Sequence, residues 1–169
     1  MFRDELKTRI SELIELKKSD NSFLSWGYVA GYTEAEIDLY QNIFGFELPK
    51  FYREFLLAIG KPNPQAGFEY SSILRGSISL ESLRNAKQDV FDPTYPIHQE
   101  ISVFADQKLV FYLIDDATDF EFFVAENDDP ETYLFNRTDG VTDFGMTFSE
   151  RILYKLEKSI KIHKSKLKI

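Results

Sequence analysis

The sequence predicts an α+β fold: a single domain over residues 1–169 in which helices pack on an antiparallel sheet and a long helix ends the chain. Apolar residues recur at helical spacing near both ends, and residues 101–137 form a strand-rich region of short apolar runs between Asp-rich turns. Sixteen Phe and nine Tyr favour strands and bulky packing. A chain of 169 residues can bury a core without metal or disulfide support.

The first predicted element is a helix at the start of the chain. Phe2, Leu6, Ile10 and Leu13 keep helical spacing, so we expect a helix over residues 2–18 with a charged outer face. A polar turn follows it, and the pattern of the next ten residues assigns no element.

A pair of short helices is predicted for residues 33–60. Thr33 and Glu36 match a capping box, in which each side chain satisfies a free backbone N–H of the first turn. Gly45 is expected to end the first helix. Pro49 stands where the second would begin, because a first-turn residue needs no N–H donor.

This helical pair also carries a family resemblance. It is similar to the signature of the SUKH superfamily, which includes a fungal cell-wall-synthesis regulator and many bacterial immunity proteins that neutralise toxins. The resemblance extends to about residue 160 and implies a SUKH-like domain. It also implies a non-catalytic immunity protein or, as in the fungal members, an intracellular scaffold or regulatory module. The matching residues are Glu36, Gly45, Leu48, Pro49, Tyr52, Arg53, Phe55, Leu56 and Gly60.

The sheet is predicted after a less regular middle segment. That segment is expected to hold a strand over residues 73–80 and a short helix over residues 80–88. The nearly continuous apolar run at residues 110–114 is typical of a central strand covered on both faces. The strands expected beyond residue 100 cover residues 101–105, 109–114, 120–126 and 133–136.

A long C-terminal helix is predicted for residues 147–165. Thr147 and Glu150 match a second capping box, and an apolar stripe follows with lysines around the rest of the helix. Residues 151–169 carry seven basic side chains and one acidic, whereas residues 1–150 carry 13 basic and 27 acidic. A body this acidic repels phosphate backbones, so we expect no direct binding to nucleic acid.

The inventory of reactive groups argues against an enzyme. The chain has no cysteine, no Gly-rich phosphate loop, and two histidines in contexts typical of loop and packing residues. We therefore expect no catalytic residue, no metal and no cofactor, although a hydrolase that uses clustered carboxylates with a divalent cation remains an alternative. The charged opening and the lack of a long apolar run predict a cytoplasmic protein that does not enter a membrane.

The candidate binding residues lie in the acidic strands and turns of residues 106–143. Solvated hairpin turns explain many of these carboxylates, because Asp favours turns. Under the immunity hypothesis, the same carboxylates would steer the protein toward the basic active-site surface of a cognate toxin, which we expect to be a nuclease, with aromatic anchors beside them. The candidates are Asp115, Asp116, Asp119, Glu121, Glu126, Asp128, Asp129 and Glu131, with Tyr112 and Tyr133 as anchors.

Overall fold

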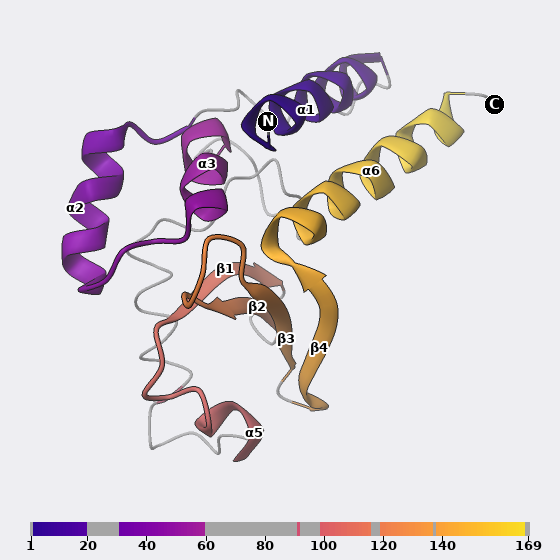
Figure 1. The fold of residues 1–169 in the computed structure, drawn as a ribbon. Coiled ribbons are helices and arrows are strands. Elements are labelled where there is room, and N and C mark those ends of the chain that lie inside the picture. Colours follow the sequence, from indigo (N-terminus) through magenta and orange to yellow (C-terminus); the bar gives the residue numbers. More distant parts are fainter. Residues whose placement is uncertain are drawn as a thin grey trace.

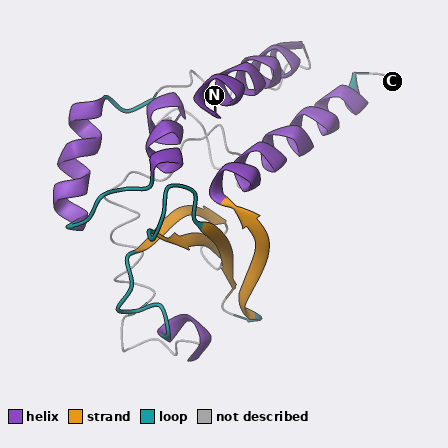
Figure 2. Cartoon of the chain, in the orientation of Figure 1, coloured by secondary structure: helices purple, strands orange, loops and turns teal. Residues whose placement is uncertain are grey.

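The fold in a computed structural model is α+β, as predicted, with helices beside a four-stranded antiparallel sheet (Figures 1 and 2). The structure describes residues 2–19, 31–59, 91, 99–115, 119–136 and 138–167. Gly60, the strand expected over residues 73–80 and the helix expected over residues 80–88 lie outside these ranges. None of the described helices is both long enough and apolar enough to cross a membrane.

The three helices of the first third of the chain are confirmed. They are α1 (Phe2–Ser19), α2 (Glu34–Phe44) and α3 (Lys50–Ile59). The capping box of α2 is present: the Glu36 N–H donates to Thr33 Oγ1 at 3.3 Å, and the Thr33 N–H donates to Glu36 Oε2 at 2.7 Å. Gly45 ends α2 in the left-handed conformation, with a φ of 77° that disfavours a side chain.

The sheet has the order β1-β2-β3-β4, and every neighbouring pair is antiparallel. Three of its strands were predicted, whereas β4 was missed because two glycines and an aspartate interrupt its apolar alternation. Its strands are β1 (Leu109–Asp115), β2 (Asp119–Val124), β3 (Glu131–Asn136) and β4 (Gly140–Thr147).

Two predictions about the sheet are wrong. Residues 101–105 are not a strand: the chain forms the short helix α5 (Gln99–Ser102) and then a turn. A short, mostly apolar segment does not distinguish a strand from a buried helical turn, and Ile101 is fully buried in the helical turn. The apolar strand β1 lies at an edge of the sheet order and not at its centre. Its side chains at residues 109–112 are nevertheless buried, because aromatic rings pack on both of its faces.

The core between the sheet and the helices is built from aromatic rings. Tyr52 of α3 packs against Phe123 of β2 and Phe148 at 5.1 and 5.4 Å between ring centroids, and Tyr112 of β1 reaches Phe148 at 5.1 Å. The opposite face of the sheet carries a second aromatic layer, in which Phe122 of β2 contacts Phe104, a residue just after α5. The described parts of β1 and β2 are therefore largely buried on both faces, whereas β4 has exposed residues.

The C-terminal helix α6 (Phe148–Lys166) follows β4 directly and packs along α1 (Figure 1). Of the predicted capping box, the bond from the Thr147 N–H to Glu150 Oε2 is present at 3.0 Å. Lys164 pairs with Glu12 of α1 at 2.7 Å, so one of the predicted outer-face lysines contributes to helix packing.

Candidate functional site

The predicted carboxylates do not form one acidic face. Asp119 is the first residue of β2, lies next to the β3–β4 turn and accepts a hydrogen bond from Asn136 Nδ2. Glu126 and Glu131 flank the β2–β3 turn at the other end of the strands (Figure 1). At about 3.3 Å per residue, the six-residue strand β2 separates Asp119 from the turn that holds Glu126 and Glu131 by roughly 17 Å. Asp115 is the last residue of β1, and Asp116 lies outside the described residues.

Two of the predicted binding residues, Glu121 and Tyr112, lie in the protein interior. Glu121 is 6% exposed and Tyr112 is 1% exposed, and the Tyr112 hydroxyl donates to Glu121 Oε2 at 2.8 Å. The expectation that they lie on an accessible surface is wrong, because the alternation of β1 and β2 turns both side chains toward α6.

Two partly buried basic residues of α6 complete an ion cluster around the buried Glu121. Arg151 donates from Nε at 3.2 Å and from Nη2 at 2.9 Å, and Lys155 Nζ pairs with the same carboxylate. Arg151 also lies over the Phe144 ring, with the guanidinium carbon 3.6 Å from the ring centroid. The cluster of Tyr112, Glu121, Arg151 and Lys155 therefore joins the sheet to α6.

The pKa values in this cluster follow from burial and charge. Burial alone raises the pKa of Glu121, but the hydrogen bonds and charges of Arg151 and Lys155 outweigh burial and hold it below its usual value. Burial, together with the adjacent Glu121 charge, raises the pKa of Tyr112 well above its usual value. Glu121 is thus ionised and Tyr112 neutral at physiological pH, which is the arrangement that a structural ion pair requires.

The β2–β3 turn is bound to the N-termini of two helices. The Phe51 N–H of α3 donates to the Asp128 carbonyl at 3.1 Å, and the Phe148 N–H of α6 donates to the Pro130 carbonyl at 2.8 Å. Asp129 accepts from the backbone N–H of Ser149 at 2.8 Å and from its hydroxyl at 2.6 Å. Asp129 thereby caps α6 from another part of the chain and is committed to the fold.

The turn and the corner between α2 and α3 enclose a polar pocket of about 220 Å³, here called the corner pocket. Glu126 and Asp128 are exposed at its rim, and Glu47, exposed on the α2–α3 corner, adds a third carboxylate. Lys108 lines it as well and lies 6.0 Å from the Phe46 ring centroid. The remaining lining residues are Leu48, Pro49, Ala125 and Asn127.

Sequence reasoning missed Glu47 and Lys108 as pocket residues. Glu47 stands about 80 positions before Glu126, and no local pattern links the α2–α3 corner to the turn. One local signal for this contact exists in the sequence, the corner from Gly45 to Pro49. A helix that starts after such a corner has free backbone N–H groups, which need acceptors from another segment.

Tyr133 is the predicted anchor that stays partly accessible. Its ring is half-buried and stacks on Phe122 at 5.3 Å between centroids. Burial and the charges of Asp143, Glu131 and Glu126 raise its pKa, so the phenol remains a neutral hydrogen-bond donor.

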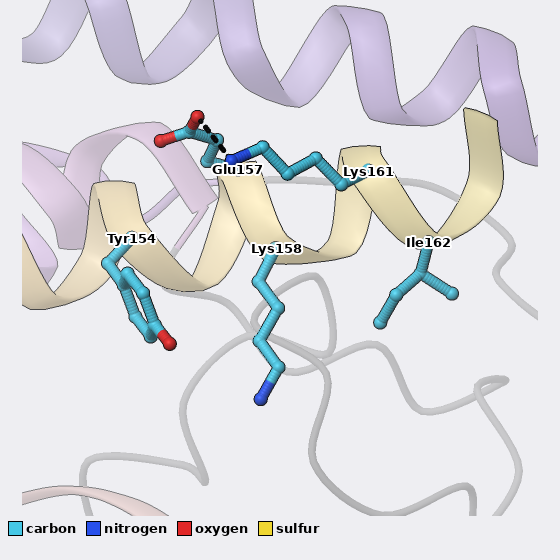
Figure 3. Close-up of a pocket in the computed structure, with 5 residues that line it drawn as sticks. All are labelled: Tyr154, Glu157, Lys158, Lys161 and Ile162. Atoms are coloured by element: carbon cyan, nitrogen blue, oxygen red, sulfur yellow. Dashed lines mark ion pairs between the residues drawn. The ribbon is translucent and has the colours of Figure 1, made fainter. Parts of the chain in front are cut away.

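A second hollow, of about 280 Å³, runs along the outer face of α6 (Figure 3). Tyr154, Lys158 and Ile162 project from one side of the helix, and Glu157 pairs with Lys161 at 3.1 Å on the other. These side chains do not converge on a common point, and we assign no chemistry to them.

Within the described residues, no group of three or more His, Asp or Glu is arranged to hold a metal ion. A scan of the chain against protein-family models finds no match, and neither does a search of the curated proteins. The resemblance to the SUKH superfamily therefore remains a prediction from the sequence.

Proposed function

We propose that this protein is a non-catalytic immunity protein of the cytoplasm that binds a cognate bacterial toxin domain and occludes its basic, nuclease-like active-site surface. The sequence resemblance supports the role. The observation that supports the surface is the corner pocket, where Glu47, Glu126 and Asp128 are brought to one exposed site by segments far apart in the chain.

The physical argument is electrostatic. A nuclease presents a basic groove to its polyanionic substrate, and clustered carboxylates on an inhibitor raise the rate of encounter with that groove. The corner pocket meets a second requirement, because hydrogen bonds to two helices hold the turn in one conformation before binding. A site that is already ordered loses less entropy on association.

The role is tested by a search for a toxin gene beside this one and by co-expression with the toxin domain that such a gene encodes. We expect the full chain to rescue growth and the purified proteins to form a stoichiometric complex. No rescue and no complex with that toxin would contradict the immunity role and favour the alternative, a scaffold or regulatory module.

The surface is tested by the double variant Glu126→Lys with Asp128→Lys. We expect its association rate with the toxin domain to fall by at least about tenfold at low salt, and the loss to shrink as salt screens the charges. The matched control, Glu5→Lys with Asp139→Lys, changes the net charge equally at exposed positions elsewhere. Equal rates for the two double variants at low salt would show that the corner pocket is not the docking surface.

A further inference from the structure

Strand β4 exposes an edge of the sheet. It is the last strand in the sheet order, and no strand pairs with its outer side within the residues that the structure describes. Thr142 and Asp143 in its middle are exposed. An open edge with unpaired backbone groups is a template for pairing with another strand.

The start of this edge is closed by a side chain from a distant part of the chain. Glu100 of α5 accepts a hydrogen bond at its Oε2 from the Val141 N–H at 2.9 Å, across 41 positions of sequence. Alternate residues of an antiparallel edge strand direct their N–H groups away from the sheet. Glu100 therefore occupies the place that the carbonyl of an added strand would take.

The neighbouring residue is adapted to this contact. Gly140 has a φ of 84°, and a Cβ built on it would lie 2.3 Å from Glu100 Oε2. A side chain at this position would displace the carboxylate, whereas glycine lets it approach the strand.

The far half of β4 is unsuited to pairing for a different reason. The register with β3 shifts between Glu131 and Tyr133, and Gly145 takes a φ of 61° while its N–H donates to Asp143 Oδ1 at 2.7 Å. Such an irregularity interrupts the flat ladder that strand addition needs. Regular pairing would therefore begin at the segment that Glu100 covers.

We propose that Glu100 is an edge guard, which prevents the β4 strands of two copies of this chain from pairing. The carboxylate blocks the Val141 N–H in each copy. An antiparallel pair of β4 strands therefore forms only when the Glu100 carboxylate of each copy moves away from its Val141 N–H. The negative charge adds repulsion between two approaching edges.

The test is sedimentation velocity of the full chain over a range of concentrations. We expect wild type to give one species throughout, and Glu100→Ala to show a weight-average mass that rises with concentration toward that of a dimer. Glu100→Gln is the matched control, because its amide oxygen still accepts the Val141 bond. A folded Glu100→Ala protein with the sedimentation of wild type would overturn the proposal, as would association of Glu100→Gln to the same extent as Glu100→Ala.

A second variant tests the same contact if Glu100→Ala does not fold. Gly140→Ala places a methyl group 2.3 Å from Glu100 Oε2, so it should displace this carboxylate and cause the same association, in addition to the strain of a side chain at a φ of 84°. Hydrogen exchange at the Val141 amide locates the event: the amide should exchange slowly in the associated form and fast in its dilute monomer. Fast exchange at Val141 in an associated variant would place the interface elsewhere and overturn the proposal.

Discussion

Glu121 and Glu126 lie five positions apart in the same acidic stretch, yet the fold uses them in opposite ways. Glu121 is 6% exposed and is bound by Tyr112, Arg151 and Lys155 beneath α6. Glu126 is exposed at the rim of the corner pocket. The difference shows that acidic composition alone does not define a binding surface, because some of these carboxylates are structural.

The turn itself repeats this division on a smaller scale. Asp129 caps α6 through Ser149, whereas its neighbour Asp128 accepts a bond from α3 at its backbone carbonyl and is itself an exposed lining residue of the corner pocket. Negative charge beside two helix N-termini is also favourable for the helices. The acidic residues of the turn therefore have a structural role in the fold, in addition to any role in binding a partner.

The largest effect on stability is expected from removal of the buried Glu121 carboxylate. Glu121→Ala leaves Arg151 and Lys155 without their shared partner, and breaking one side of a buried ion pair typically costs about 3 kcal/mol or more. Urea unfolding should show this loss in the free energy of unfolding, while the matched control Glu126→Ala stays close to wild type. Equal stability of the two variants would contradict the inference that Glu121 supports the fold and Glu126 does not.

A smaller effect should follow from protonation of the same group. Because the pKa of Glu121 is lower in the folded state, its contribution to stability is complete above its unfolded value, about 4.3, and is lost as pH falls through the folded value. We expect wild type to lose more stability than Glu121→Gln on acidification below that point. The measurement is chemical denaturation of both proteins at a series of pH values. If the free energy of unfolding falls in parallel for wild type and Glu121→Gln, the prediction is contradicted.

Removing the cap of α6 should lower the stability of the fold by a smaller amount. Asp129→Ala deletes the acceptor of two hydrogen bonds from Ser149, and such a cap contributes about 1–2 kcal/mol. Asp128→Ala serves as the control, since its carbonyl bond to Phe51 remains. Thermal unfolding of both variants checks this, and a control that is destabilised as much as Asp129→Ala would count against the division within the turn.

The smallest effect is expected at the corner pocket. Within the described residues, no hydrogen bond or ion pair uses the carboxylates of Glu126 or Asp128. Converting both to Lys should therefore change the free energy of unfolding by no more than about 0.5 kcal/mol, as is usual at exposed sites. Urea unfolding measures the change, and a larger loss of stability would assign these carboxylates to the fold.

Much of the fold was predictable because its signals are local. The spacing of Phe2, Leu6 and Ile10 predicted α1, and the pair Thr33 and Glu36 predicted the start of α2, since helix periodicity and capping involve residues within a few positions. The predictions that failed depend on distant packing. Residues 101–105 and strand β4 have weak local patterns, and their conformation is decided by the layers against which they pack.

The candidate site was harder to predict for the same reason. Carboxylates close in sequence were expected to share a face, but β2 separates them into two groups and turns Glu121 inward, while the corner pocket recruits Glu47 from the helical pair. No spacing within the acidic stretch carries that information.

The sequence by itself determined the α+β class, the helices α1, α2, α3 and α6, the caps of α2 and α6, and the acidity of the strand region, because these follow from local propensity and composition. The tertiary structure alone decided which carboxylates are buried, which two segments meet at the corner pocket, and which strand edge Glu100 covers. Those outcomes depend on contacts across tens of residues, where the geometry of packing determines the environment of each charge.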